Sequence, residues 1–110
     1  MKHIDTPMFV VLARYIQPET VALKFLADHR AFIESGYEAG YFVASGAGTN
    51  GDPGVIVATG LSKDALREFL KRDAFYLNSV ASHEILEFHG SRASDGLAAE
   101  IEQPPKPAAV

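Results

Sequence analysis

The 110-residue chain contains no cysteine, and this absence removes several kinds of chemistry at once. Without thiols the protein has no disulfide framework, no cysteine nucleophile and no thiolate metal site. A composition of this kind fits a protein that folds in a reducing compartment. We therefore expect a cytoplasmic location.

Long hydrophobic runs and clusters of basic residues are missing as well. The longest strongly apolar run near the start, residues 8–13, stops at Arg14. It is too short to span a bilayer or to form the core of a signal peptide. Ten Lys and Arg stand against 14 Asp and Glu, a net charge of −4, with no basic cluster to meet phosphates. We expect neither a membrane nor a nucleic acid as partner.

What remains is the composition of one small globular domain. Hydrophobic residues make up 47% of the chain and charged residues 22%. A chain of this length buries roughly 60–65% of its unfolded surface, enough for a modest core. We expect a short leader of low order at residues 1–7, a folded domain at 8–90 and a tail at 91–110. The tail is predicted to be disordered or loosely docked, with a short helix over 94–102 as the alternative.

Hydrophobic periodicity predicts four strands and two helices. The strands fall at residues 8–15, 41–46, 55–59 and 83–88. The first helix runs over 19–36, from Pro18 in a favourable entry position to Gly36 as a left-handed cap, and the second begins after Ser62. This β-α-β-β-α-β order predicts a ferredoxin-like α+β fold, a four-stranded antiparallel sheet with both helices on one face. Residues 47–54 form a long loop that is either mobile or faces a ligand.

The first strand is apolar on both of its alternating faces. Phe9 and Val11 lie on one face, and Val10 and Leu12 lie on the other. Helices can cover only one of these faces, and an apolar patch of that size is rarely left to water. We therefore expect the bare faces of two sheets to pack together in a symmetric homodimer.

One histidine stands on the apolar face of the first predicted helix. The face consists of residues at helical spacing: Ala22, Phe25, Leu26, His29, Phe32 and Ile33. His29 in this position is either a core histidine whose ring nitrogens are satisfied by neighbours, or a titratable group at the wall of a pocket. The pattern by itself leaves both interpretations open.

A carboxylate occupies the corresponding place on the second helix. Asp73 follows Leu70 by three residues on the inner stripe, at a helix end where a carboxylate is disfavoured by up to about 1 kcal/mol. Residues that break local rules are often functional. Alternatively, the helix ends at Lys71 or Arg72 and Asp73 caps the next turn. Because both helices lie on one side of the sheet, Asp73 and His29 can meet, and the carboxylate would then make the imidazole a general base.

Other candidate residues are weaker. Arg14 could meet an anionic substrate, although an arginine at a strand end more often faces solvent. His83, Glu87 and His89 are strung too far along one strand to share a metal ion, so we expect no metal site. The glycines of residues 46–54 do not have the spacing of a phosphate-binding loop. The chain also lacks the serine elbow of hydrolases.

Five short motifs, in this order and spacing, resemble the YciI-like (YCII-related) family over about residues 8–88. They are HRAF at 29–32, ASG at 44–46, GVIV at 54–57, DAF at 73–75 and HEILEF at 83–88. The resemblance implies a ferredoxin-like fold that dimerises into an α+β barrel. It also implies an active site built on a histidine in the first helix and an aspartate after the second, which match His29 and Asp73.

The motifs depart from the family pattern at three places. The family usually has Gly-Pro where this chain has Gly46-Ala47, and commonly has Asp-Pro-Phe where this chain has Asp73-Ala74-Phe75. Close relatives often carry an arginine in the loop before the third strand, and residues 50–53 hold none. The pair is retained while its surroundings differ, which predicts a ligand different from that of better-matched members.

The resemblance implies a type of chemistry and no particular substrate. One relative resembles a dehydrochlorinase of a chlorinated hydroxyquinol, and similar dimeric barrels include lactone isomerases and small monooxygenases. Our leading hypothesis is a cofactor-free lyase or isomerase acting on a small cyclic or aromatic metabolite. His29 would move the proton and Asp73 would orient it, while Ser45, Gly46 and Phe75 shape the pocket.

Two other hypotheses belong to different classes of protein. In one, the chain is a non-catalytic dimer that binds a small ligand or assists a neighbouring enzyme. In the other, His29 and Asp73 form a buried polar pair that only fixes helix packing, although such pairs are not reliably stabilising.

Overall fold

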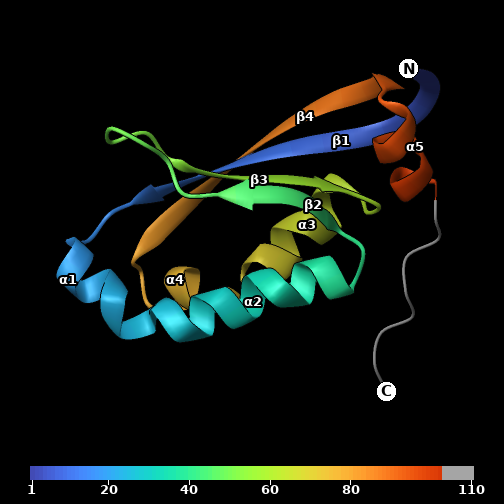
Figure 1. Ribbon diagram of the computed structural model, residues 1–110. Helices are drawn as coiled ribbons and strands as arrows, with labels where there is room; N and C mark the ends of the chain where they lie inside the picture. Colours follow the sequence, from blue (N-terminus) through green and yellow to red (C-terminus); the bar gives the residue numbers. More distant parts are fainter. Residues whose placement is uncertain (103–110) are drawn as a thin grey trace.

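A four-stranded antiparallel sheet with helices on one of its faces organises the computed structural model, which describes residues 1–102 (Figure 1). The strand order is β2-β3-β1-β4. The strands are β1 (Lys2–Tyr15), β2 (Phe42–Gly46), β3 (Gly54–Thr59) and β4 (Ala81–Ala93). The central strand β1 pairs with β3 on one side and with β4 on the other. The ferredoxin-like α+β fold predicted from the periodicity is confirmed.

The helices divide more finely than the sequence pattern predicts. They are α1 (Glu19–Ala22), the 3₁₀ turn η1 (Leu23–Phe25), α2 (Leu26–Glu38), α3 (Lys63–Leu70), α4 (Ala74–Leu77) and α5 (Asp95–Ile101). The single helix predicted over 19–36 is therefore interrupted by η1 and continues to Glu38. In the part of the chain that the structure describes, no helix combines the length and apolar character needed to cross a bilayer.

Two predicted helix ends have different outcomes. Gly36 is not the left-handed cap of the first helix but lies inside α2, and the left-handed residue after it is Gly40, with φ of 82°. Ser62 caps α3 as predicted, because its Oγ accepts a hydrogen bond from the Ala65 N–H at 3.1 Å.

Both ends of the described chain are more ordered than the sequence suggests. The leader of low order predicted at residues 1–7 is wrong, because Lys2 pairs with Ala93 and Thr6 with Gly90 in the β1–β4 ladder. Residues 91–93 extend β4, and α5 contacts both β1 and β4, which agrees with the alternative of a short helix. The remainder of the predicted tail, residues 103–110, lies outside the described residues.

The main core lies between the sheet and the helices α2 and α3. It consists of Phe9, Val11, Phe32, Phe42, Ile56, Ala58, Leu66, Phe69 and Leu70. Phe32, Phe42 and Phe69 pack against one another with ring centroids 5.2–5.9 Å apart, at tilted or edge-to-face angles. Gly36 brings α2 so close to this cluster that a Cβ atom there would overlap the Phe42 ring. The glycine is therefore required by packing.

Replacing Gly36 with alanine should destabilise the protein by about 1–3 kcal/mol, because the added methyl group overfills the core against Phe42. Urea unfolding measures the change. Gly96→Ala in α5 is the matched control, since a Cβ there meets nothing within 4 Å. Its stability should be unchanged or slightly higher. Equal effects of the two substitutions would contradict this account of α2 packing.

The sheet face opposite the main core is apolar and half exposed. Val10 of β1 pairs with Val57 of β3 and with Leu86 of β4, so the three side chains share that face. Leu86 and Phe88 are 50% and 48% exposed, a large apolar area for two neighbouring residues on one strand. We propose that a second copy of the chain covers this face.

Light scattering after size exclusion should therefore give a dimer at micromolar concentration, and Leu86→Asp should shift it to a monomer. The substitution places a charge in the middle of the proposed contact and removes no core residue. Leu23→Asp, at a 59% exposed leucine of η1, is the matched control and should remain dimeric. A wild-type monomer would contradict the proposed contact.

Candidate active site

Asp73 begins a helix, and it does not end one. Helix α3 stops at Leu70, and the Asp73 Oδ1 atom accepts a hydrogen bond from the Phe75 N–H at 3.0 Å, which caps α4. The inner-stripe position predicted for Asp73 at the end of the second helix is therefore wrong, and the capping alternative is correct. The carboxylate is consequently at the favourable, N-terminal end of a helix.

The same carboxylate meets His29. The His29 Nδ1 atom lies 2.8 Å from Asp73 Oδ1, and the side chains are 20% and 1% exposed. The His29 ring also stacks on Phe75, with ring centroids 3.9 Å apart and planes 4° from parallel. The structure thus brings together the two residues that the sequence analysis paired. Asp73 and Phe75 contact the imidazole from two sides and hold it in one orientation.

The protonation state of Asp73 determines which nitrogen of His29 is free. Burial is the largest influence and alone would raise the pKa of the carboxyl, but the His29 and His83 imidazoles and the Phe75 N–H outweigh it. Together they lower the Asp73 pKa to about 2. An ionised carboxylate only accepts hydrogen bonds, so the His29 Nδ1–H is the donor. In the neutral imidazole, Nε2 therefore keeps its lone pair.

His83 is a third member of the cluster that the sequence analysis did not connect with the site. Its Nε2 atom lies 3.2 Å from Asp73 Oδ2, an ion-pair distance, yet outside hydrogen-bond geometry. Asp73 Oδ2 is consequently buried without a hydrogen-bond donor among residues 1–102. The alternation of β4 offered a signal, because it places His83 on the same face as the half-buried Ile85.

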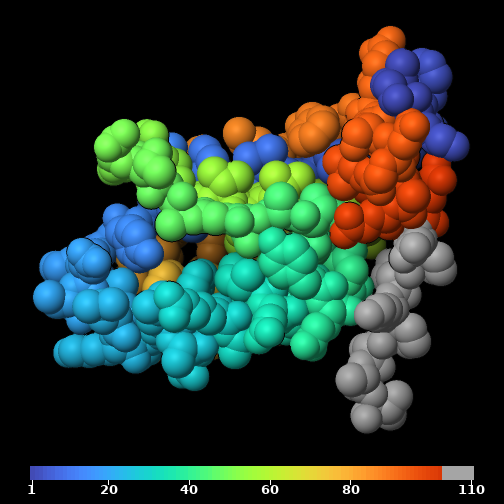
Figure 2. All heavy atoms as spheres, viewed as in Figure 1, coloured from blue at the N-terminus to red at the C-terminus, as the bar shows by residue number. Residues whose placement is uncertain are grey.

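A cleft of about 680 Å³ opens beside this cluster, between α2 and the strands, and Figure 2 shows it as a hollow. His29, Phe75 and His83 line it from the helix side and from β4. The loop between β2 and β3 closes another side through Ala47, Gly48 and Asp52. The loop therefore lines the cleft, which is where a loop that faces a ligand would lie.

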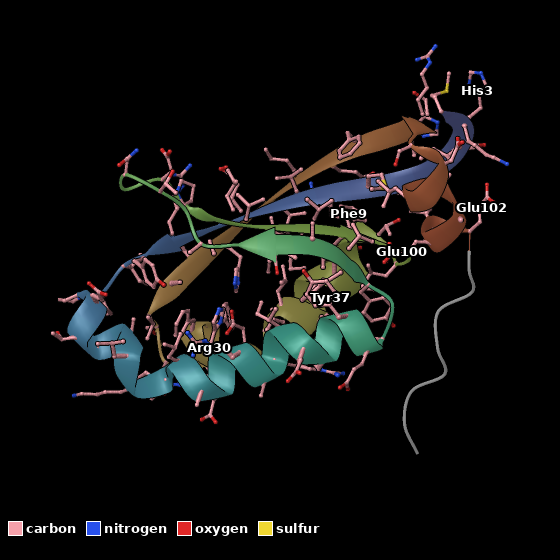
Figure 3. The ribbon with its side chains drawn as sticks, viewed as in Figure 1. His3, Phe9, Arg30, Tyr37, Glu100 and Glu102 are labelled. Atoms are coloured by element: carbon pink, nitrogen blue, oxygen red, sulfur yellow. The ribbon has the colours of Figure 1, made fainter. Side chains whose placement is uncertain are left out.

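The residues proposed to bind substrate have different locations. Ser45 and Gly46 line the cleft at the end of β2, and the Ser45 Oγ atom is 2.7 Å from the Tyr37 hydroxyl. Arg14 is exposed near the end of β1, opposite Ser82, and does not line the cleft. The cation that does line it is Arg30, which follows His29 on α2; Figure 3 shows Arg30 and Tyr37 on that helix.

The other histidine considered as a metal ligand has a separate partner. His89 Nε2 lies 3.1 Å from Asp5 Oδ1 at the surface, away from the carboxylate that His83 approaches. Across residues 1–102, no group of three or more His, Asp or Glu residues is arranged to hold a metal ion.

Comparison with known families agrees with the resemblance noted from the motifs. Residues 8–89 match the model of the YCII-related domain, and this segment contains both His29 and Asp73. No curated protein matches the chain.

The lowered pKa of Asp73 makes stability depend on pH in a defined window. The pKa is about 2 in the folded protein against an ordinary value of 3.8, so the ionised carboxylate stabilises the fold above about pH 4. Because the folded state binds fewer protons, this contribution, on the order of 2 kcal/mol, should be lost as the pH falls from about 4 to 2.

Urea unfolding of the wild type and of Asp73→Asn, from about pH 5 to pH 2, measures this loss. The stability difference between the two proteins should shrink as the pH falls. Asp28→Asn, which removes an exposed carboxyl from α2, is the matched control. A difference between wild type and Asp73→Asn that stays constant over the window would contradict the assignment.

Proposed function

Because the chain belongs to the YCII-related domain family, we propose that it is a cofactor-free enzyme of the lyase or isomerase type. Its substrate would be a small cyclic or aromatic metabolite, and His29 would act as the general base. The observation that carries this proposal is the 2.8 Å hydrogen bond between His29 and Asp73. It leaves Nε2 as the unbonded nitrogen of a side chain that lines the cleft.

The proposed step is the removal of a proton from carbon. His29 Nε2 takes a proton from a carbon next to a carbonyl group, and the electron pair of the broken C–H bond moves to the carbonyl oxygen as an enolate. The imidazolium that forms faces the ionised Asp73, which stabilises it. Returning the proton to another carbon completes an isomerisation. Departure of a leaving group with its electron pair from the neighbouring carbon completes an elimination.

The walls of the cleft carry hydroxyl groups that can stabilise an enolate oxygen and aromatic side chains that can contact a cyclic substrate. The Tyr37 and Ser45 hydroxyls, 2.7 Å apart, can donate a hydrogen bond to an oxygen that gains negative charge. Tyr15, which is exposed, lines the same cleft beside the buried Phe75, with ring centroids 5.8 Å apart, and offers apolar ring surface to a cyclic substrate. These features support a small planar carbon acid as the substrate class.

The proposal is tested by deuterium exchange, which requires no knowledge of the product. A panel of cyclic enones and lactones is incubated with the protein in D₂O, and loss of C–H signals is followed by proton NMR. The wild type should accelerate exchange, and His29→Ala should lower that rate by about 10²–10⁴-fold, as expected when a general base is lost. His89→Ala, at an exposed histidine far along β4, is the matched control and should retain the rate.

Asp73→Asn tests whether the exchange rate depends on the tautomer and orientation of His29 as well as on its presence. The amide can donate to His29 Nδ1, so the neutral ring should shift to the tautomer with the proton on Nε2 and exchange should slow. Nitrogen NMR of the imidazole reports the tautomer directly. Compounds that bind the wild type while their exchange stays at the buffer rate would instead favour the non-catalytic ligand-binding alternative.

A further inference from the structure

A second cavity, of about 360 Å³, lies between α3 and β4 and is lined by basic side chains. Lys63 and Arg67 line it from α3, Lys71 lines it from the position that follows α3, and Tyr76 and His83 complete its polar wall. None of its lining residues is acidic. We call this cavity the basic groove.

The three cations of the basic groove form one stripe. Four residues of α-helix rise about 6 Å, so Lys63, Arg67 and Lys71 lie on one face over about 12 Å. Like charges at this spacing repel one another and destabilise a helix slightly. In a chain whose net charge is −4, this local concentration of positive charge indicates a site for an anion of more than one charge.

The ion pairs that the cations of the stripe already make would compete only weakly with a bound anion. Arg67 contacts Asp64 and Lys71 contacts Glu68, each at 2.8 Å, but these carboxylates are 93% and 71% exposed. Exposed pairs of this kind contribute at most about 1 kcal/mol. Lys63 is half-buried and makes no ion pair within residues 1–102. A multivalent anion can therefore replace the two carboxylates and engage Lys63 as well.

The wall opposite the three cations contains two rings whose NMR signals can report binding in the groove. His83 lines both the basic groove and the cleft, and its ring stacks with that of Tyr76, with centroids 6.3 Å apart and planes at 16°. An anion in the basic groove would lie close to the His83 ring. Binding there should consequently change the signals of the His83 and Tyr76 rings.

We propose that the basic groove binds a compact polyanion, most simply a diphosphate group, across Lys63, Arg67 and Lys71. The basic groove shares only His83 with the lining of the cleft of the proposed function. Its test needs no turnover, so the failure of either proposal leaves the other standing.

The test is a titration of the full chain with inorganic pyrophosphate at constant ionic strength, followed by amide and imidazole NMR. We expect saturable binding with a Kd of about 1 mM or below, with shifts gathered on α3, Tyr76 and His83 and absent from His89. Inorganic phosphate should bind about tenfold more weakly, because it spans fewer cations. Citrate binding as tightly as pyrophosphate would identify the ligand class as polyanions in general, and weaker citrate binding would identify diphosphates.

Charge-removing variants locate the site. The double variant Lys63→Gln with Lys71→Gln should weaken pyrophosphate binding by about tenfold or more, while circular dichroism shows that the helices persist. Lys2→Gln with Lys24→Gln removes the same charge outside the groove and should bind as the wild type does. Absence of saturation, shifts scattered over the surface, or equal weakening in the two double variants would each overturn the proposal.

Discussion

The ionised carboxylate of Asp73 is the constraint on which the arrangement of the site depends. Taking a charge out of water costs several kcal/mol unless polar groups surround it. Here they come from three elements: His29 from α2, the Phe75 N–H from α4 and His83 from β4. Moving any one of these elements would leave a buried charge without its partner. The carboxylate thus fixes the relative positions of two helices and an edge strand.

Phe75 links this polar cluster to the packing of the fold. Its N–H donates to Asp73, its ring lies flat against His29, and it belongs to a second core cluster with Ala22, Val80 and Ala81. The same residue therefore caps a helix, orients an imidazole and fills a core. Substitutions of Phe75 would therefore change stability and site geometry together, whereas substitutions of His29 and Asp73 act on the pair itself.

Hydrophobic periodicity predicted the elements that are determined by residues close together in the sequence. It missed the elements that form through contacts between residues far apart in the sequence. The apolar stripe of the first helix and the Ser62 cap depend on residues close to them in the sequence. The prediction that both helices lie on one face of the sheet followed from the order of the elements. The strand over residues 2–7 forms because Lys2 pairs with Ala93, a contact that no local pattern encodes. Helix α4 has four residues, too few to show a helical period, so the actual position of Asp73 was only an alternative.

The missing donor at Asp73 Oδ2 is itself informative about the site. Leaving a buried oxygen without a hydrogen bond costs about 1–3 kcal/mol, and the ion-pair contact between Oδ2 and His83 Nε2 at 3.2 Å offsets part of that cost. Because Oδ2 faces the His83 Nε2 atom at 3.2 Å and Oδ1 faces His29 Nδ1 at 2.8 Å, the negative charge of the carboxylate is shared between two imidazoles. An ionised carboxylate held between two imidazoles beside a cleft is the arrangement that the proposed acid–base pair of His29 and Asp73 requires.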